Sequence, residues 1–467
     1  MSSKDGSGDY DEKTRQILAG MIEAENRAIA RKQEQPACEC KQGMFPATDR
    51  RGFLTRMAAA GTGTAALLGQ GLAAAAAGSV DYKVQADPTR EPGRPIGADD
   101  GYGSRSQFEN EVRWRYPTAT RESSWSMTPL EQGNGIITPS GLHFERHHAG
   151  IPNIDPARHT LTVHGMVNTA KRFSMAALQR FPSVTRMHFI ECSGNGLTEW
   201  KKPTLKTVQG THGLTSTSEW TGVPVATILR ECGIEDGAAW ILAEGSDAAV
   251  MARSIPIDKM WDDAVLAYAQ NGEALRPEQG YPLRLLLPGF EGNTCIKWLR
   301  RLEVSDKPFM TREETSKYTD LVNGGKARQF TFTMDAKSVI TFPSGDMRLP
   351  GQGFYEITGI AWSGRGRITQ VEVSTDGGAS WQTAELQTPV LPRCHTRFRF
   401  PWHWHGGPTI LQSRCRDETG YTQPTIAQLV AVRGLDGHPL YGSIYHNNGI
   451  QSWAIARDGS VTNVHHF

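Results

Sequence analysis

The sequence predicts a two-domain protein of the α+β class, in which a mixed domain of strands and helices precedes an immunoglobulin-like β-sandwich. The chain has 467 residues, which is too long for one compact core. From about residue 141 to 310, short apolar stretches alternate with helix patterns. From about residue 325, Thr, Val, Trp and Phe alternate with polar residues, as in antiparallel strands. We therefore expect a leader over 1–77, a mixed domain over 78–325 and a sandwich over 326–467.

Four segments support the mixed domain. Residues 159–167 alternate apolar and polar side chains and predict a strand. Residues 174–182 begin with a serine N-cap and end at a proline, which predicts a short helix. Residues 223–233 predict a helix that ends at its final glycine. Residues 281–289 predict a buried strand followed by a Pro-Gly turn.

The second domain shows the patterns of antiparallel strands. Residues 355–386 predict a strand, a turn, a second strand, an Asp-Gly-Gly turn and a third strand. Residues 395–402 and 409–417 predict a further antiparallel pair. That pairing would bring Cys394 opposite Cys415, so a disulfide and two free thiols both remain open.

The leader resembles a twin-arginine export signal. Arg50 and Arg51 precede a weakly apolar Ala- and Gly-rich stretch that ends in a small-residue block at 75–77. A transmembrane helix is the less favoured alternative, because Gln70 interrupts the stretch and few of its residues are strongly apolar. This export route carries folded proteins, often with a cofactor inserted beforehand. We therefore expect a periplasmic mature chain, from about Gly78, that holds a bulky prosthetic group.

Composition and motifs exclude several classes. The net charge is only +1, so there is no overall basic field that would indicate nucleic-acid binding. The sequence contains no C-x-x-C-H for covalent haem, no C-x-x-C pair, no H-E-x-x-H and no G-x-G-x-x-G. The run "WHWH" at 402–405 offers two histidines, too few for most metal sites, and we interpret it as a turn or interface patch.

One cysteine stands out in "MHFIECSGNGLTEW", residues 187–200. Cys192 ends an apolar stretch and precedes a Gly-rich turn. A thiolate is a soft metal ligand, and glycines allow a large cofactor to approach the backbone. The plain alternative is a buried, unreactive thiol. Cys192 is therefore the candidate for attaching a prosthetic group to the chain.

Several blocks, in order, resemble the sulfite oxidase family of molybdenum–molybdopterin enzymes. Within that family the chain is similar to the molybdenum subunits (sulfite or sulfane dehydrogenases) of bacterial thiosulfate-oxidising (Sox) complexes, which pair with a separate c-type cytochrome. The blocks are "FERHH" (144–148), "ECSGNG" (191–196), "GLTSTSEWTGVPVATIL" (213–229), "LAYAQNGEALRPEQGYPLRLLLPGFEGNTCIKWLRRLEV" (266–304) and "ITQVEVSTDGGASW" (368–381).

The resemblance implies roles for individual residues. Cys192 would be the protein ligand of molybdenum, and Arg146 and Tyr318 would be catalytic residues facing the oxo group and the substrate. Taken singly, Arg146 also suits an ordinary surface position, Tyr318 a core ring and Asp247 a turn cap. The cofactor-binding residues that the resemblance implies are Phe144, Arg146, His148, Cys192, Asp247, Gln279, Arg284 and Lys297.

Two departures from the family pattern bear on the substrate. Gln279 replaces a pterin-contacting histidine, and Asn448, in "YHNNG", replaces a substrate-binding arginine of vertebrate members. We expected the loss of that arginine to make the anion pocket less cationic. This predicts that the substrate is sulfur carried on a larger group, such as a protein-bound sulfane, in place of free sulfite.

The resemblance implies a periplasmic, molybdenum-dependent oxidation of sulfur compounds. The family adds an oxygen from water to sulfur and takes two electrons through Mo(VI) and Mo(IV). We expect one molybdopterin per chain, no haem in this chain, a c-type cytochrome as electron acceptor and homodimer contacts through the second domain. A sulfur-carrier protein is a further expected partner; nucleic acid and a membrane span in the mature chain are not expected. The alternatives are a molybdopterin reductase of sulfoxides or nitrate, and a non-catalytic binding protein.

Overall fold

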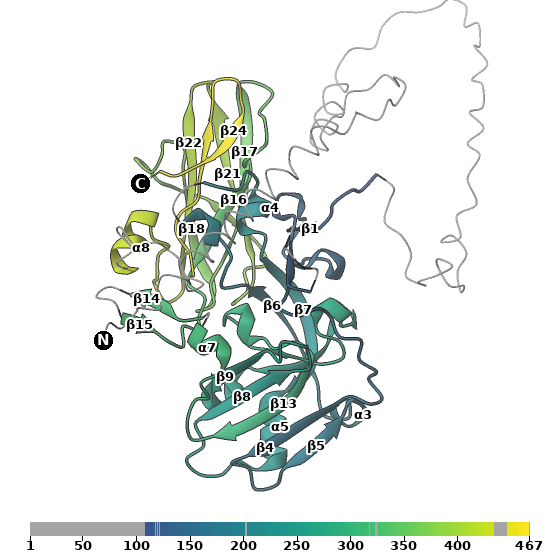
Figure 1. Ribbon diagram of the computed structural model, residues 1–467. Coiled ribbons are helices and arrows are strands. Elements are labelled where there is room, and N and C mark those ends of the chain that lie inside the picture. Colours follow the sequence, from purple (N-terminus) through teal and green to yellow (C-terminus); the bar gives the residue numbers. More distant parts are fainter. Residues whose placement is uncertain are drawn as a thin grey trace, which may run out of the picture. The chain divides into compact units, whose positions relative to one another are not determined.

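The computed structural model describes residues 108–116, 118, 120, 122–200, 203–316, 318–322, 326–433 and 446–466. Residues Glu111–Phe467 belong to one compact unit. The predicted leader, with its arginine pair and Cys38 and Cys40, lies outside the described residues. The fold class is as predicted: a mixed α+β domain is followed by a β-sandwich (Figure 1).

The first sheet of the mixed domain positions the candidate cysteine. It has the order β11-β10-β7-β6, with β12 beside β10, and all its pairs are antiparallel. The cysteine follows directly after β6, where that strand leaves the sheet. The strands are β6 (Val184–Glu191), β7 (Thr215–Pro224), β10 (Val265–Gln270), β11 (Glu273–Ala274) and β12 (Arg284–Leu286).

A second sheet, of order β5-β4-β13-β8-β9, packs against the first through a shared apolar core. Strand β13 runs parallel to β4 and antiparallel to β8, which gives this sheet its mixed character. Residues of both sheets, including Leu161 and Leu285, are fully buried in this core. The strands are β4 (Thr160–Gly165), β5 (Lys171–Ser174), β8 (Trp240–Gly245), β9 (Ala252–Pro256) and β13 (Leu299–Ser305).

The four predicted segments of the mixed domain form the expected elements. Residues 159–167 contain β4 and residues 281–289 contain β12. The segment 174–182 contains α3 (Met175–Leu178), whose N-cap hydroxyl of Ser174 accepts a hydrogen bond from Ala177 N at 3.1 Å. Helix α5 (Val225–Cys232) ends at a glycine with φ of 68°, a conformation that favours glycine. The remaining short helices of this part are α4 (Val208–His212), α6 (Ile257–Asp262) and α7 (Arg312–Ser316).

A small N-terminal sheet, β1-β2-β3, carries one wall of the candidate site. Its strands are β1 (Trp114–Arg115), β2 (Ser124–Met127) and β3 (Glu145–His147), and both pairs are antiparallel. Strand β3 contains Arg146, which pairs in register with Trp125. Two of the three strands of this sheet, β1 and β2, therefore come from the segment before residue 140.

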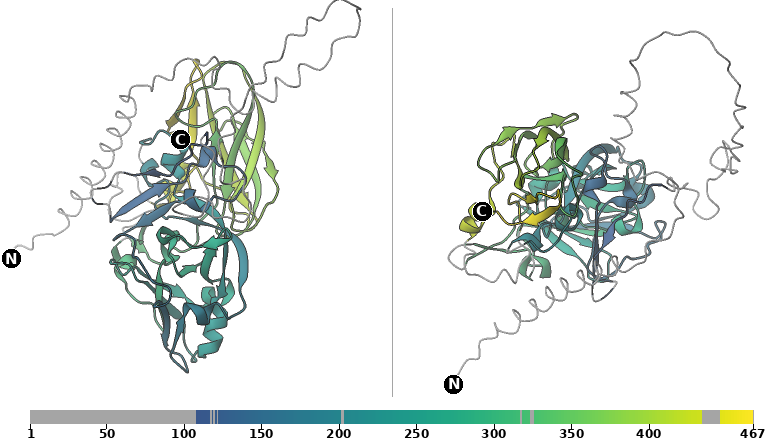
Figure 2. Two further views of the ribbon diagram at one scale, coloured as in Figure 1. Left: turned by 90° about the vertical axis from the view of Figure 1, so that its right-hand side faces the viewer. Right: turned by 90° about the horizontal axis from the view of Figure 1, so that it is seen from above.

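The C-terminal part is a sandwich of two sheets, seen face to face in the green-to-yellow region of Figure 2. One sheet has the order β16-β17-β21-β20 and the other β19-β18-β22-β23-β24. Their facing side chains form a second core that includes Trp362 and Trp453. The strands are β16 (Lys337–Phe342), β17 (Gly353–Trp362), β18 (Ile368–Ser374), β19 (Gln382–Thr383), β20 (Glu385–Gln387), β21 (Thr396–Trp404), β22 (Thr409–Asp417), β23 (Ser452–Ile455) and β24 (Val461–Val464).

The predicted pairing of residues 395–402 with 409–417 is wrong. Strand β21 pairs with β17 and β20, whereas β22 pairs with β18 and β23 in the opposite sheet. The alternation of side chains is the same whichever sheet a strand joins, so the pattern does not reveal the crossing from one sheet to the other. Cys394 and Cys415 are both free: the Cys394 thiol donates to Met187 O at 2.8 Å, and Cys415 is buried in the sandwich core.

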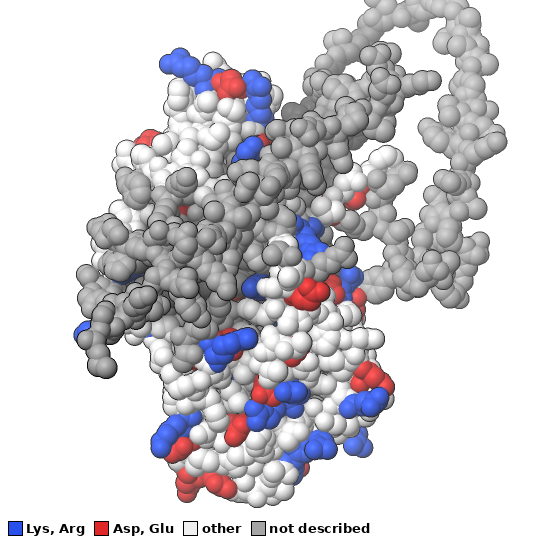
Figure 3. All heavy atoms as spheres, viewed as in Figure 1, with Lys and Arg blue, Asp and Glu red and all other residues white. Residues whose placement is uncertain are grey.

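The remaining elements complete the described part. Strands β14 (Asp320–Val322) and β15 (Lys326–Arg328) pair on either side of residue 325, and the domain limits that we placed there stay a prediction. Helix α8 spans Ile426–Arg433. Among the described helices, none combines the length and the apolarity needed to cross a bilayer. On the face shown in Figure 3, acidic and basic side chains are interspersed in small groups.

Candidate active site

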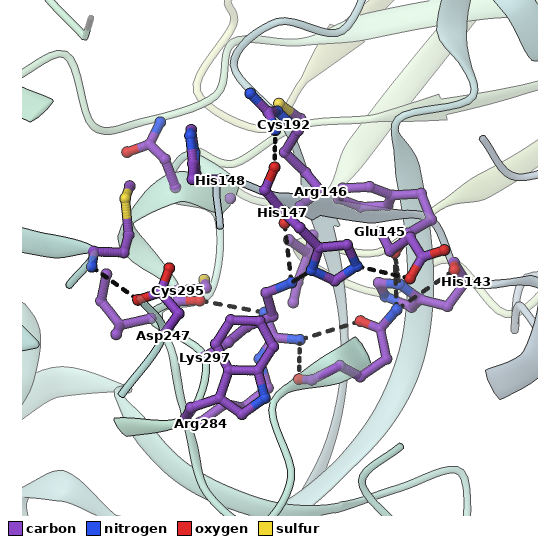
Figure 4. A pocket seen from close by; sticks show the side chains of 18 of the residues that line it. His143, Glu145, Arg146, His147, His148, Cys192, Asp247, Arg284, Cys295 and Lys297 are labelled. Atoms are coloured by element: carbon purple, nitrogen blue, oxygen red, sulfur yellow. Dashed lines mark hydrogen bonds and ion pairs between the residues drawn. The ribbon is translucent and has the colours of Figure 1, made fainter. Parts of the chain in front are cut away.

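One cavity brings together all nine residues that the sequence singled out. It encloses about 680 Å³ of empty space, including the part open to solvent. In Figure 4, Cys192 lies at one end of the labelled group and Arg284 toward the other. The predicted residues in its wall are Phe144, Arg146, His148, Cys192, Asp247, Gln279, Arg284, Lys297 and Tyr318.

The turn after β6 presents Cys192 to the cavity. Cys192 N donates to Leu214 O at 3.0 Å, and Asn195 N donates back to Cys192 O at 2.9 Å, which closes the turn. Burial raises the pKa of the Cys192 thiol, while the Gly194 backbone and the charge of Arg146 act in the opposite direction. A metal that binds this sulfur must therefore displace its proton.

Strand β3 supplies the adjacent wall. Arg146 donates to His147 O, and its guanidinium lies 5.2 Å from the ring centre of Trp125 on the paired strand β2. Phe144 and His148 flank the strand and also line the cavity. The "FERHH" segment thus places an aromatic ring, a permanent cation and an imidazole around one space.

Lys297 is a half-buried cation held by neutral acceptors. Its ammonium group donates to Arg146 O at 2.9 Å, to Glu278 O at 3.0 Å and to His147 Nδ1 at 3.0 Å. Burial, reinforced by the charge of Arg284, lowers the pKa of Lys297 to about 7. Removal from water thus opposes the charge on this lysine, and an added anion would restore it.

His147 and Glu145 support this lysine from behind. His147 Nε2 lies 2.8 Å from Glu145 Oε2, so the ring donates there and accepts from Lys297. Burial lowers the pKa of His147 to about 4, so the ring is neutral at pH 7. Burial alone would raise the pKa of Glu145, but the hydrogen bond from His147 and the charge of Arg113 bring it to about 2.

Arg284 is the second cation of the wall, and it is buried. Its guanidinium donates to Gln279 O at 3.0 Å and to Cys295 O at 3.3 Å, and it lies 4.9 Å from the ring centre of Trp220. Burial lowers the pKa of Arg284 to about 10. The side-chain amide of Gln279 donates a hydrogen bond to Phe144 O at 2.9 Å. Gln279 therefore links Arg284 to the residue that precedes strand β3.

Asp247 and Tyr318 also line the cavity. Asp247 Oδ1 accepts from Met251 N at 2.9 Å, so this residue caps a turn as well as lining the cavity. Tyr318 is buried, and the guanidinium of Arg253 lies 4.9 Å from its ring centre. Burial raises the pKa of the Tyr318 hydroxyl, which therefore keeps its proton and can donate a hydrogen bond.

The wall fits an anionic, polar cofactor. Within the described residues, no carboxylate oxygen lies within 4.0 Å of the Arg284 or Lys297 cation. Three buried polar atoms of the wall also lack a hydrogen-bond partner there: Arg284 Nε, His143 Nε2 and Asn293 Oδ1. Buried charge and unpaired polar atoms are costly unless a ligand satisfies them. Cys192 adds one soft ligand for a metal.

Some expectations of the sequence differ from the structure. Asn448 is not among the residues that line the cavity: its amide donates to Ala336 O at 3.2 Å and to Tyr421 Oη at 3.0 Å. Cys295 is buried in the core of the mixed domain and also lines the cavity. The sequence reasoning missed the supporting pair Glu145–His147 and the amide of Asn293; of these, the pair lies within the "FERHH" block.

The "WHWH" run lies at the end of strand β21. His403 and His405 are exposed, with ring centres 4.8 Å apart. The described residues contain no group of three or more His, Cys, Asp or Glu arranged to hold a metal ion. The first three residues of the run thus end strand β21 and His405 follows the strand, so the expectation of a turn fails for those three; an interface patch stays a prediction.

Comparison with known proteins identifies the two parts of the chain. Residues 148–313 match the Oxidoreductase molybdopterin binding domain, and residues 328–452 match the Mo-co oxidoreductase dimerisation domain. The crystal structure of the sulfane dehydrogenase SoxCD from Paracoccus pantotrophus matches with 45% identity and a TM-score of 0.75, over 80% of this chain and 96% of that chain. The chain belongs to the sulfite oxidase family. It is therefore an oxidoreductase of the molybdopterin class, with a dimerisation domain that indicates contacts between copies.

More distant relatives of the family are plant nitrate reductases. The NADH nitrate reductase of Cichorium intybus is 34% identical over 309 residues, which are 58% of this chain and 33% of that protein. A nitrate reductase of Phaseolus vulgaris is 34% identical over 59% of this chain and 35% of that protein. The chain thus spans about a third of the length of these relatives.

Replacing Lys297 should change how stability depends on pH. In the cofactor-free chain the pKa of Lys297 is about 7, below its ordinary value of 10.5, so between these limits the unfolded chain binds more protons than the folded chain. The free energy of unfolding should accordingly gain a contribution that rises with pH above about 7. Lys297→Met should remove it, as measured by urea unfolding over a pH series. The exposed Lys307→Met is the control, and an equal rise in the parent and Lys297→Met would contradict the interpretation.

Proposed function

We propose that the protein is a periplasmic molybdenum dehydrogenase of sulfur compounds that passes electrons to a c-type cytochrome. The observation that carries this proposal is the 45% identity to a sulfane dehydrogenase over 96% of that chain. The cavity supports it with the Cys192 thiol at one end and two cations, Arg284 and Lys297, that have no carboxylate partner among the described residues.

The chain's own residues would hold the cofactor at two places. Cys192 would bind molybdenum through its sulfur, because it is the thiol in the wall that directly precedes the Gly-rich turn. Arg284 and Lys297 would bind the anionic part of the pterin, and Gln279, His148 and Asp247 would surround it. When bound, the cofactor would supply the two-electron redox chemistry that no side chain provides.

The substrate would bind beside Cys192. Arg146 offers a permanent positive charge for an anionic sulfur group. Tyr318 retains its hydroxyl proton because burial raises its pKa, so it would donate a hydrogen bond to an oxygen of the substrate. Both residues would thus orient the sulfur atom and stabilise negative charge on its oxygens.

The proposed substrate is a sulfane sulfur carried on a larger group, with free sulfite as the competing substrate. The cavity adds no support to the argument from the arginine that Asn448 replaces, because Asn448 is not among the residues that line the cavity. The proposal now depends on the similarity to a sulfane dehydrogenase. A single cofactor per chain and electron transfer to a cytochrome without haem in this chain remain parts of the proposal.

Nitrate reduction is the second candidate. It is favoured by the similarity to plant nitrate reductases, which extends over 58% of this chain at 34% identity. Sulfoxide reduction belongs to the same class of reaction, in which the substrate gives up oxygen. Both would run the oxygen transfer in the opposite direction to sulfur oxidation.

Substrate assays should separate these candidates. With a c-type cytochrome as acceptor, kcat/KM should be higher for a persulfide on a carrier-protein cysteine than for free sulfite. With a reduced dye as donor, nitrate and sulfoxides should be turned over slowly. The matched control is the same carrier protein without the sulfane sulfur. High-affinity oxidation of free sulfite would reject the sulfane substrate, and fast nitrate reduction would favour the second candidate.

Cys192→Ser should abolish turnover, because it replaces the soft sulfur ligand by a hydroxyl. We expect a loss of at least about 100-fold in kcat, since replacing outer partners of metal ligands already costs roughly 10–100-fold. Rates with the sulfur substrate and the Mo(V) electron paramagnetic resonance (EPR) spectrum are the measurements. Cys232→Ser makes the same change at a thiol that does not line the cavity. Parent-like turnover and an unchanged spectrum in Cys192→Ser would reject the ligand role.

The proposed export signal depends on the arginine pair. Arg50→Lys combined with Arg51→Lys should keep the protein in the cytoplasm, as measured by cell fractionation and immunoblotting. Arg56→Lys is the matched control, because it changes an arginine of the same segment outside the pair. An unchanged periplasmic share in the double variant would contradict the twin-arginine assignment.

A further inference from the structure

We propose that the β-sandwich domain positions the metal ligand Cys192 through a buried contact to the preceding residue, Glu191. The residues that make this contact are Lys337 at the start of β16 and Trp362 at the end of β17, both in the C-terminal part of the chain (Figure 1). They are positioning residues, because they act on Cys192 through Glu191 and do not line the cavity. The proposal rests on Cys192 being the metal ligand of the proposed function.

The carboxylate of Glu191 is held from several directions. Glu191 and Lys337 have no exposed side-chain surface, and Lys337 Nζ lies 2.6 Å from Glu191 Oε1. Trp362 Nε1 donates to the other oxygen, Oε2, at 2.7 Å, and the Asn195 amide donates to Oε1 at 2.9 Å. With donors on both oxygens from different elements, the carboxylate has one well-defined orientation.

The same contacts extend to the turn that contains Cys192. Lys337 Nζ also donates to Asn195 O at 3.3 Å, and Asn195 N closes the turn on Cys192 O at 2.9 Å. On the far side of the turn, Asn447 of the "YHNNG" segment donates to Gly196 O at 3.0 Å. The C-terminal part of the chain therefore contacts this turn before and after the cysteine.

A role in stability alone does not explain this arrangement. Burying an ion pair costs desolvation free energy that is about as large as the attraction between the two charges. Apolar side chains of similar size often stabilise the folded chain as much as the ion pair does, or more. A buried pair with defined donors does, however, fix the orientation of its groups. Because Glu191 is covalently next to Cys192, fixing Glu191 limits where the sulfur can lie.

Two variants test the proposal without leaving a buried charge unpaired. Trp362→Phe removes one hydrogen-bond donor and keeps an aromatic ring. Glu191→Gln combined with Lys337→Met removes both charges together, which avoids the large cost of an isolated buried charge. Lys259→Met is the matched control: Lys259 is also a largely buried lysine, paired with Asp263 at 2.7 Å, and does not line the cavity.

Three readouts are needed. The first is the rate of Cys192 alkylation in the cofactor-free protein, followed peptide by peptide with mass spectrometry. The second is the set of Mo(V) EPR g-values of the loaded enzyme, and the third is Tm. We expect alkylation to become about fivefold faster in both test variants, the change expected for loss of roughly one buried hydrogen bond, together with shifted g-values. The control should lower Tm without either change.

The outcomes are decisive in both directions. Parent-like alkylation and g-values in both test variants would overturn the proposal. Equal acceleration in Lys259→Met at an equal loss of Tm would also overturn it, because the effect would then be a general loss of stability. A separate measurement tests whether Cys192 is the metal ligand. In the parent, loading the cofactor should protect Cys192 from alkylation, and absence of that protection would contradict the proposed function. The comparison of the cofactor-free chains would remain valid in that case.

Discussion

Removal of positive charge from water without a nearby carboxylate is the constraint around which the cavity is organised. Arg284 is buried and Lys297 is half-buried, and the described residues offer them carbonyl oxygens, an amide, an imidazole and aromatic rings, but no carboxylate within 4.0 Å. Such an arrangement is unfavourable in the empty chain, as the lowered pKa of Lys297 shows. An anionic cofactor would reverse this cost, so the chain would gain stability from the ligand that makes it an enzyme.

The sheets explain how these groups converge. Arg284 begins β12, Arg146 lies on β3, and Cys192 follows β6. Each comes from a different strand, and the pairing of the strands fixes where its side chain can reach. The site therefore depends on the pairing of strands that are far apart in the sequence. A rigid scaffold of this kind is suited to holding a metal and a substrate at fixed positions relative to each other.

The C-terminal sandwich has more than one part in this arrangement. Its family assignment is a dimerisation domain, yet Lys337, Trp362 and Asn447 contact the turn that carries Cys192. The two domains of this chain are therefore joined at the segment that carries Cys192.

The sequence by itself determined the two-domain class, the strand and helix types of the mixed domain, and nine of the residues that line the cavity, because family motifs and short-range periodicity are local properties. It failed where the answer depends on which distant segments meet. Strands β21 and β22 have the pattern of a hairpin but join opposite sheets, Asn448 lies outside the cavity, and Glu191 looks like any acidic residue until Lys337 and Trp362 are beside it. Only the tertiary structure decided these, since burial and partner are set by contacts between residues more than 100 positions apart.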